Sequence, residues 1–268
     1  MKIGEALPQI FHRTYPVLEP QTQMLLAVSL LRFHQIDALP IGFRPQQKKR
    51  LAVFGYSCLS KLLETDPNDY GKFLELPCKK AALELSTVEI DDSIEDLLRV
   101  FEKTKFGFAW VESERMGGFA SLRDLLQLYE KGLISTEMTA GEVASPIFSL
   151  PADTDLKRVI EEMFSHRYRR IFISGEKSLV TDRRIISYLF STSRIGGTSK
   201  QPRSLLDAKL DDLEKMNPVE VKGKNKIKSA ALSMKEASED CLVCEKGVIT
   251  PWDLVMKPLI KGKLKIST

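Results

Sequence analysis

The sequence lacks the marks of a membrane or exported protein. Its longest apolar run, from Met24 to Leu31, is broken by Ser29, whereas a membrane-spanning helix needs about 20 apolar residues. No basic stretch followed by an apolar one opens the chain, so no export leader is indicated. We therefore expect a cytoplasmic protein without a membrane segment. Its 268 residues, 43% hydrophobic and 28% charged, suit two globular domains.

Catalytic signatures are also scarce. The chain has three histidines, His12, His34 and His166, and no P-loop, nucleophile elbow or metal-ligand cluster accompanies them. His166 is interpreted as a surface residue. The glycine pair within residues 193–200 is not followed by a convincing phosphate-binding helix, so we interpret it as a linker between two halves. We expect no enzymatic activity and no catalytic cofactor.

Four cysteines are too scattered to indicate a metal site. Cys241 and Cys244 form a C-x-x-C pair, but they lie in a predicted buried strand, on which positions three apart face opposite sides. Zinc usually needs four ligands, and Cys58 and Cys78 stand far away without suitable spacing. We interpret these residues as buried, inert thiols.

The net charge of +4 is mild, but lysines gather in places. They are Lys222, Lys224, Lys226, Lys228, Lys261, Lys263 and Lys265, with the basic loop QQKKR at residues 46–50. A solvated basic face and a surface that binds nucleic acid are both open interpretations. No aromatic residues interleave the lysines, so base stacking has little support. Steep loss of affinity with salt would identify nucleic-acid binding.

The sequence does contain a fourfold repeat. Similar segments occur at residues 54–60 (FGYSCLS), 118–124 (GFASLRD), 178–184 (SLVTDRR) and 247–253 (GVITPWD). Their hydroxyl residues, Ser57, Ser121, Thr181 and Thr250, are separated by 64, 60 and 69 residues. The second and fourth segments end in an acid, Asp124 and Asp253. The first and third segments have Ser60 and Arg184 at that position.

The stretches before these segments agree as well. In the third copy, the apolar residues recur at the spacing of a helix: Leu156, Val159, Ile160, Met163 and Phe164. Asp153 is placed to cap that helix, and RRIFI follows it as a strand. In the second copy, the same spacing relates Ile94, Leu97, Leu98 and Phe101, and FGFAWV follows. Each unit is therefore predicted to run strand, helix, strand, strand, helix.

The T-x-x-D pattern has two interpretations. In the first, Thr250 caps a helix, Pro251 occupies its first position and Asp253 completes a capping box. In the second, the same helix start binds a ligand. The unpaired N–H groups and the hydroxyl attract a phosphate, and the carboxylate accepts hydrogen bonds from a ribose diol. Trp252 is interpreted as a packing residue, with stacking on a base as the alternative.

Each unit resembles the cystathionine-β-synthase (CBS) domain, a β-α-β-β-α module whose motif ends in Ser or Thr, two variable residues and Asp or Asn. Residues 118–124 and 247–253 match that motif fully, and the other two copies lose the acid. The resemblance covers nearly the whole chain, leaving no room for a catalytic domain. It implies an α/β (α+β) fold in which four modules form two pseudo-symmetric pairs in a flat, disc-like body.

The implied boundaries divide the chain into halves. The first CBS pair takes residues 1–134, with modules at about 1–70 and 71–134. The second takes residues 135–268, with modules at about 135–197 and 198–268.

The resemblance also implies ligands that contain adenosine: AMP, ADP, ATP, S-adenosylmethionine or NAD. The best site is expected at Thr250 and Asp253, lined by Pro218 and Val219. The next is expected at Ser121 and Asp124, lined by residues 85–88, including Ser86 and Val88. Without the acid, the cleft at Thr181 is expected to stay empty or take a bare anion, and the cleft at Ser57 to bind weakly. Arg169 and Arg170 are expected to reach phosphates.

The resulting expectation is a regulatory binding protein that senses an adenosyl ligand. Ligand binding would change the arrangement or association of the modules. A homodimer and an unidentified protein target are expected partners. Nucleic-acid binding through the lysines is the alternative.

Overall fold

The computed structural model describes residues 1–13, 15–34, 36–42, 50–65, 70–113, 117–191, 205–237 and 241–267. Most of the predicted basic loop at 46–50, and the predicted linker at 193–200, lie outside the described residues. None of the described helices is long and apolar enough to cross a membrane.

The predicted order of strand, helix, strand, strand, helix is confirmed in three of the four units. We name the modules first (residues 15–84), second (85–135), third (148–217) and fourth (218–268). The third module consists of β8 (Ser149–Leu150), α8 (Leu156–His166), β9 (Arg170–Ile173), β10 (Leu179–Thr181) and α9 (Asp182–Leu189). Strand β9 lies between the other two, parallel to β8 and antiparallel to β10.

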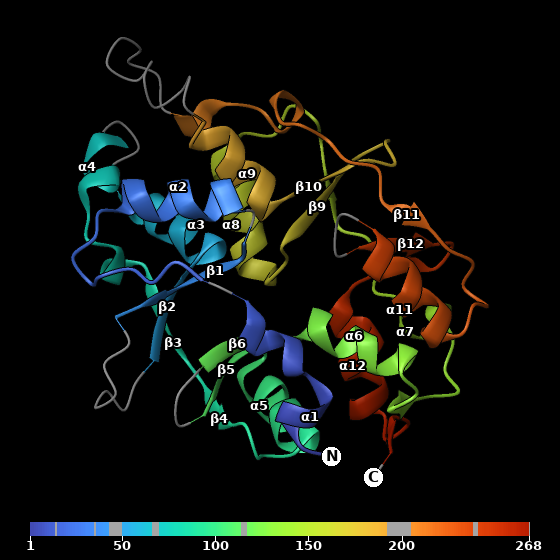
Figure 1. The fold of residues 1–268 in the computed structure, drawn as a ribbon. Coiled ribbons are helices and arrows are strands. Elements are labelled where there is room, and N and C mark those ends of the chain that lie inside the picture. Colours follow the sequence, from blue (N-terminus) through green and yellow to red (C-terminus); the bar gives the residue numbers. More distant parts are fainter. Residues whose placement is uncertain are drawn as a thin grey trace. The chain divides into compact units, whose positions relative to one another are not determined.

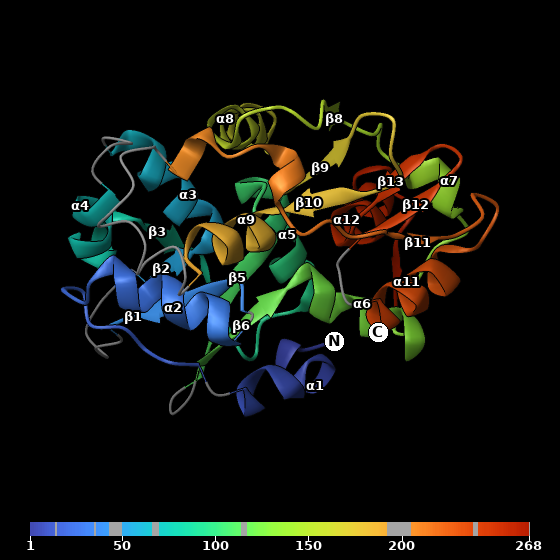
Figure 2. The same ribbon diagram turned by 90° about the horizontal axis from the view of Figure 1, so that it is seen from above.

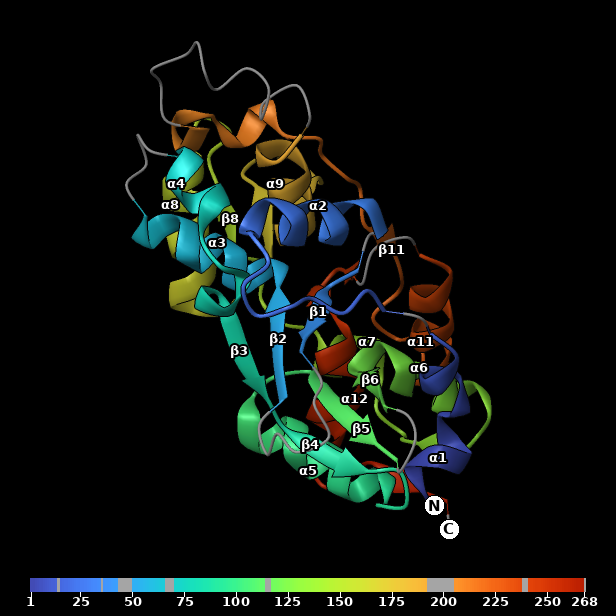
Figure 3. The same ribbon diagram turned by 60° about the vertical axis from the view of Figure 1, so that its left-hand side comes forward.

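The second and fourth modules repeat this topology. The second consists of β4 (Thr87–Glu89), α5 (Ile94–Thr104), β5 (Phe108–Glu112), β6 (Gly117–Ser121) and α6 (Leu122–Glu130). The fourth consists of β11 (Val219–Glu220), α11 (Ile227–Glu236), β12 (Leu242–Cys244), β13 (Gly247–Ile249) and α12 (Pro251–Ile260). In both, a parallel pair is followed by an antiparallel hairpin. Figure 2 shows β11–β13 beside α11 and α12, and Figure 3 shows β4, β5 and β6 side by side.

The first module is the least regular. It contains α2 (Met24–His34), β1 (Ala38–Ile41), β2 (Arg50–Phe54) and α3 (Gly55–Glu64). Its leading strand is reduced to a parallel bridge between Leu18 and Ile41. Strand β3 (Ala82–Leu85) completes a sheet in the order β1-β2-β3.

The chain forms two compact units. Unit 1 comprises Met1–Thr14, Leu85–Ile147 and Pro218–Thr268, and unit 2 comprises Tyr15–Glu84 and Phe148–Asn217. Unit 1 thus unites the second and fourth modules, and unit 2 the first and third. Each unit takes one module from each predicted half, so the pairing of modules within residues 1–134 and 135–268 stays a prediction.

Each unit has its own hydrophobic core. In unit 1, α6 packs against α11 and α12, and in unit 2, α3 packs against α8 and α9 (Figure 1). The helical spacing predicted the buried faces correctly except for Phe164, which is only partly buried. Nine-tenths or more of each of these residues is buried: Ile94, Leu97, Leu98, Phe101, Leu156, Val159, Ile160 and Met163. Burial of such side chains is the main favourable contribution to folding.

The predicted cap of α8 was wrong by two residues. The N-cap is Asp155, not Asp153, and its side chain makes no capping hydrogen bond. Instead the Asp155 carboxylate accepts a 2.6 Å hydrogen bond from Lys209. The residue that flanks the helix therefore holds a neighbouring segment rather than the helix's own backbone.

Short helical segments, which the sequence patterns did not predict, attach to all four modules. They are α1 (Ile3–Ala6) with η1 (Pro8–His12), α4 (Tyr70–Glu75) with η2 (Cys78–Lys80), α7 (Ala140–Val143), and η3 (Leu205–Asp207) with η4 (Leu210–Asp212). Each forms a β-bridge with the residue just before the first helix of a module. The bridges are Lys2 to Ser93, Gln23 to Pro77, Thr139 to Lys226 and Asp155 to Lys209.

Two of these segments, which we call arms, pack not on the module that follows them in the sequence but on the next one. The N-terminal arm (residues 1–13) precedes the first module but packs on the second, where it contacts α5 and β6. The internal arm (residues 136–147) precedes the third module but packs on the fourth, against α12 and β13. Both arms therefore belong to unit 1.

Candidate functional site

The second helix of three modules starts with a hydroxyl cap. Ser121, Thr181 and Thr250 are the N-caps of α6, α9 and α12. Each side-chain oxygen accepts a hydrogen bond from the backbone N–H three residues later, at 3.3 to 3.5 Å. These caps satisfy donors that a helix start otherwise leaves without a partner. The capping interpretation is therefore realised in the structure.

The first module departs from the predicted alignment. The N-cap of α3 is Phe54, and Ser57 stands at the third helical position. The Ser57 hydroxyl accepts a hydrogen bond from the Phe54 N–H at 3.0 Å and donates to the Phe54 carbonyl at 2.9 Å. Ser57 thus occupies the place of the acid, not of the hydroxyl anchor. The prediction was displaced by three residues because α3 begins immediately after β2, at Gly55.

Asp253 is the more enclosed of the two motif acids, with 2% exposure. Its Oδ2 accepts hydrogen bonds from the Thr250 N–H at 2.7 Å and from the Thr250 hydroxyl at 2.8 Å. Its Oδ1 accepts from the Ser145 hydroxyl at 2.7 Å and pairs with Lys257 Nζ at 2.9 Å. A carboxylate offers about four lone-pair sites. Four donors from the protein therefore match its capacity.

Asp124 has a similar environment with a different cation. Its Oδ2 accepts hydrogen bonds from the Ser121 N–H at 2.9 Å and the Ser121 hydroxyl at 2.6 Å. Its Oδ1 forms an ion pair with Arg13, the last described residue of the N-terminal arm. The Asp124 side chain is 4% exposed, whereas that of Arg13 is 42% exposed. A buried carboxylate is thus reached from outside by one guanidinium.

The motif glycine has a separate role. Gly118 and Gly247 stand three residues before the hydroxyls of the second and fourth modules. A Cβ atom would lie 2.5 Å from the Ile10 carbonyl oxygen at Gly118, and 2.0 Å from the Ser145 carbonyl oxygen at Gly247. Gly247 also has a φ of +141°, which only glycine adopts readily. The glycines therefore allow the two arms to cross these strands.

Capping geometry by itself does not identify a ligand site. Ser93 and Asp96 at the start of α5 form the same capping box, with the hydroxyl 2.6 Å from Asp96 Oδ2. The Asp96 side chain is 44% exposed and pairs with Arg99 of its own helix. Asp124 and Asp253 differ in being buried and in contacting an arm. These two properties, not the S-x-x-D spacing, set them apart.

The third module replaces the acid with Arg184, which pairs with Glu214 at 2.8 Å. The neighbouring Arg170 begins β9 opposite Thr181. Its buried Nε has no hydrogen-bond partner among the residues that the structure describes. This helix start therefore offers a hydroxyl and two guanidiniums, which suit an anion, and it has no carboxylate at the motif position; the Asp182 carboxylate at the first helical position pairs with Arg169.

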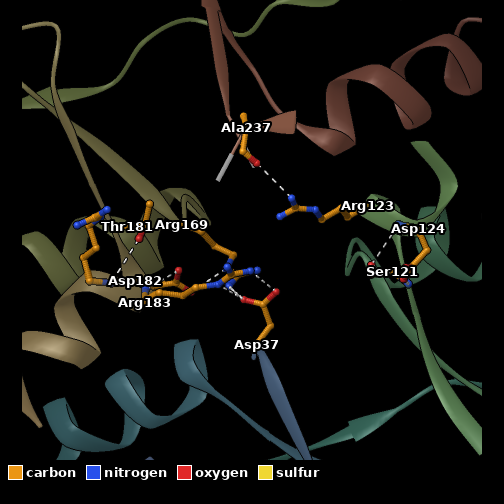
Figure 4. A network of polar contacts seen from close by, with 10 residues as sticks. Asp37, Ser121, Arg123, Asp124, Arg169, Thr181, Asp182, Arg183 and Ala237 are labelled. Carbon is orange, nitrogen blue, oxygen red and sulfur yellow. Dashed lines mark hydrogen bonds and ion pairs between the residues drawn. The ribbon is translucent and has the colours of Figure 1, made fainter. Parts of the chain in front are cut away.

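Arg169 was predicted to contact a phosphate, but the structure places it in a charge cluster within unit 2 (Figure 4). It donates to Asp182 at 2.7 Å and to Asp37 at 2.7 Å. Arg183 donates to both oxygens of Asp37, at 2.8 and 2.7 Å. Burial alone would raise the pKa of Asp37, but the two guanidiniums outweigh it and hold that pKa far below its ordinary range. The cluster joins the first module to the third.

The predicted lining residues lie next to the expected strands. Val219 is the first residue of β11 and is exposed, and Pro218 precedes it. Val88 is buried in β4, and the Ser86 carbonyl accepts a 2.9 Å hydrogen bond from the Trp110 N–H. Trp252 packs, partly buried, against the core of unit 1. Their contacts with a ligand stay predictions.

The remaining predicted features are ordinary. His166 is half exposed, lies 3.3 Å from Glu162 and stacks with Tyr168, as expected of a surface residue. Cys58, Cys78 and Cys241 are buried as predicted, and burial raises the pKa of the Cys58 thiol; the prediction was wrong for Cys244, which is only half-buried. No group of three or more His, Cys, Asp or Glu suited to a metal ion occurs in the described part of the chain.

Three lysines of the fourth module, Lys226, Lys261 and Lys263, lie near α7 and the acids beside it. Lys226 lies 4.0 Å from Glu137, and Lys261 donates to the Glu142 carbonyl at 3.3 Å. The hydrogen bonds from Thr139 lower the pKa of Glu142, and the charges of Lys261 and Lys263 lower it further. The surface is therefore mixed in charge, which fits the solvated interpretation better than a continuous nucleic-acid track.

Three site contacts were absent from the sequence-based predictions. Lys257 stands four residues after Asp253 on one helix, a spacing that brings side chains together, so a sequence signal existed. Arg13 and Ser145 come from distant arms, and no local pattern indicates such contacts.

Comparisons with known proteins support the fold. No family model and no curated protein matches the chain. Protein MJ1225 from Methanocaldococcus jannaschii, described as a proposed archaeal homologue of g-AMPK, is 16% identical with a TM-score of 0.82, and the match covers 96% of this chain and 99% of that one. An uncharacterized conserved protein from Pyrococcus horikoshii is 11% identical with a TM-score of 0.50, covering 82% of this chain and 90% of that one.

A shorter match is the CBS domain protein PAE2072 from Pyrobaculum aerophilum, solved in complex with AMP. It is 16% identical with a TM-score of 0.38, covering 47% of this chain and 90% of that one. At these identities the likeness is one of fold. The chain thus has the fold of the CBS-domain proteins, with four modules in a single polypeptide.

Proposed function

We propose that this protein is a non-catalytic sensor that binds an adenosine-containing ligand at the helix starts of its second and fourth modules. The candidates are AMP, ADP, ATP, S-adenosylmethionine and NAD. The observation that carries the proposal is the buried carboxylate beside a capping hydroxyl at both places, Asp124 with Ser121 and Asp253 with Thr250. The third module, without an acid, is proposed to take a bare anion.

The chemistry of these helix starts suits a ribose phosphate. The N–H groups and the partial positive charge of α6 and α12 favour a phosphate. The carboxylate provides acceptors for the diol. In the fourth module Lys257 contacts Asp253, so a cation offsets the repulsion between that carboxylate and a nearby phosphate. This arrangement favours the nucleotides over S-adenosylmethionine, whose sulfonium is positive.

Binding at these carboxylates requires an exchange of donors. Because Asp253 already accepts from four groups, a diol must displace some of them. The Ser145 hydroxyl and the Lys257 ammonium are the donors that lie outside the capping box. A ligand that displaces them binds one arrangement of the protein better than another. Such differential affinity is what a sensor needs to shift a conformational equilibrium.

The direct test is isothermal titration calorimetry of the full chain with the five ligands. Asp124→Asn and Asp253→Asn keep the side-chain shape and remove the charged acceptor. We expect each to weaken binding at its site by about 10- to 100-fold, as loss of hydrogen bonds to a charged group predicts. Asp96→Asn is the matched control, because it alters an equivalent capping box that is exposed.

Two outcomes would contradict the proposal. One is that none of the five ligands binds the unaltered chain. The other is that Asp96→Asn weakens binding as much as the motif variants do, which would show that they act through stability. Transmission to a partner protein, and assembly of the sensor as a homodimer, are part of the same proposal and would be tested by mass measurement in solution with and without ligand.

A further inference from the structure

The N-terminal arm is fixed to the second module at one end. The Ile3 N–H donates to the Asp92 carbonyl at 2.9 Å, and the Gly4 N–H donates to the Ile90 carbonyl at 3.0 Å. Apolar residues of the arm are buried in the core of unit 1: Ile3, Ala6, Leu7 and Ile10. Phe11 is partly buried against the same core, and His12 and Arg13 are exposed. The arm thus has a buried base and an exposed tip.

The tip ends on the motif acid. Arg13 pairs with Asp124 Oδ1, while Ser121 provides both donors to Oδ2. A diol needs two lone pairs of the carboxylate, and the capping box uses those of Oδ2. The diol and the guanidinium therefore require the same oxygen. While the guanidinium is paired with this oxygen, the diol cannot donate to it in its usual geometry, and a bound diol prevents the ion pair in the same way.

The fourth module lacks this arrangement. Its arm contributes the neutral Ser145, whose backbone exchanges hydrogen bonds of 2.8 and 2.9 Å with Val248. The cation on Asp253 comes from Lys257 in the same helix. Movement of the internal arm would break backbone pairing, whereas the contact of the N-terminal arm with Asp124 is made by a side chain that is 42% exposed. The two acid sites are therefore controlled differently.

We propose that Arg13 is an intramolecular competitor for the second module's site, so that ligand binding at Asp124 and docking of the arm tip exclude each other. The inference rests on the proposed function, because it concerns ligand binding at the same carboxylate. Competition from Arg13 makes the affinity of the second site for its ligand lower than it would be without this ion pair. Occupancy of that site would release the arm tip, a change that a partner protein can detect. At the fourth site the competing cation, Lys257, belongs to the same helix as Asp253, so its displacement releases no arm tip.

The test is a calorimetric titration of the full chain carrying Asp253→Asn, which leaves the second site as the principal acid site. AMP, ADP and ATP are used as probes. Adding Arg13→Ala removes the competitor, and we expect each bound probe to bind about tenfold tighter, the size of one charge-assisted hydrogen bond at a half-exposed position. Arg13→Gln, which keeps a long side chain without the charge, should act in the same direction.

The matched control is Lys2→Ala. It removes another cation of the same arm, whose ion pair with Asp91 is exposed and does not touch the site. We expect no change in affinity. If Arg13→Ala leaves affinity unchanged or weakens it, the inference is overturned and Arg13 is a ligand contact or a bystander. If no probe binds any variant or the unaltered chain, the proposed function fails and takes the inference with it.

Discussion

Replacing Asp37 with Asn removes one carboxylate from the charge cluster of unit 2. The variant leaves Arg169 and Arg183 facing a neutral amide, with Asp182 still paired to Arg169. Breaking a buried ion pair from one side costs about 3–5 kcal/mol. Because both guanidiniums are about one-third exposed, we reduce this to about 2–3 kcal/mol of unfolding free energy.

The loss should depend on pH in a defined direction. Asp37 has a folded pKa far below its ordinary value, because Arg169 and Arg183 outweigh the effect of burial. Its contribution is therefore complete above the unfolded pKa of about 3.9 and is lost as pH falls toward the folded pKa. We expect the difference between the unaltered chain and Asp37→Asn to stay constant from about pH 7 to pH 5 and to shrink below about pH 4.

The assay is urea denaturation followed by circular dichroism across this pH range. Asp91→Asn is the control, because its 2.8 Å pair with Lys2 is exposed and should change stability by less than about 0.5 kcal/mol. An Asp37→Asn chain as stable as the control variant, or a deficit that is the same at every pH, would refute this account of the cluster.

Two further predictions concern backbone and thiol positions. Gly247→Ala is expected to lower the free energy of unfolding by at least about 3 kcal/mol, because it combines an unfavourable φ with a clash against Ser145. The control Gly175→Ala, with positive φ but open space, should cost only about 1 kcal/mol. Equal unfolding midpoints of the two variants in urea would contradict the crossing-arm explanation. In the native protein, the half-buried Cys244 should react with a thiol reagent before Cys58, because burial raises the pKa of the Cys58 thiol. Peptide mapping after brief labelling measures this order, and faster labelling of Cys58 would contradict the prediction.

Local patterns in the sequence determined the units of this fold. The apolar spacing of residues 94–101 and 156–163 predicted helices that the structure confirms, because a helix buries one face and that face recurs every three or four residues. The hydroxyls Ser121, Thr181 and Thr250 marked three helix starts correctly, since capping is a contact between near neighbours. Ser57 misled because a hydroxyl can also serve at the third helical position.

Tertiary structure alone decided which distant residues contact the motif acids. Arg13 reaches Asp124 from 111 residues away, and Ser145 reaches Asp253 from 108 residues away. Contacts at such separation depend on which module each arm packs against, and no periodic pattern records that choice. One trace of it exists in the sequence: Gly118 and Gly247 mark the strands that the arms cross, whereas Ser178 stands at that position in the third module.

The same division holds for the charge cluster. From sequence, Arg169 was a cation near a strand and therefore a candidate for phosphate. In the structure Asp37, from another module, supplies the carboxylate that occupies it. The sequence by itself thus determined the four modules and where three of their second helices begin, because short-range periodicity and capping are local. Only the tertiary structure decided which carboxylates and cations from distant segments meet, because Coulomb interactions depend on distance in space and not along the chain.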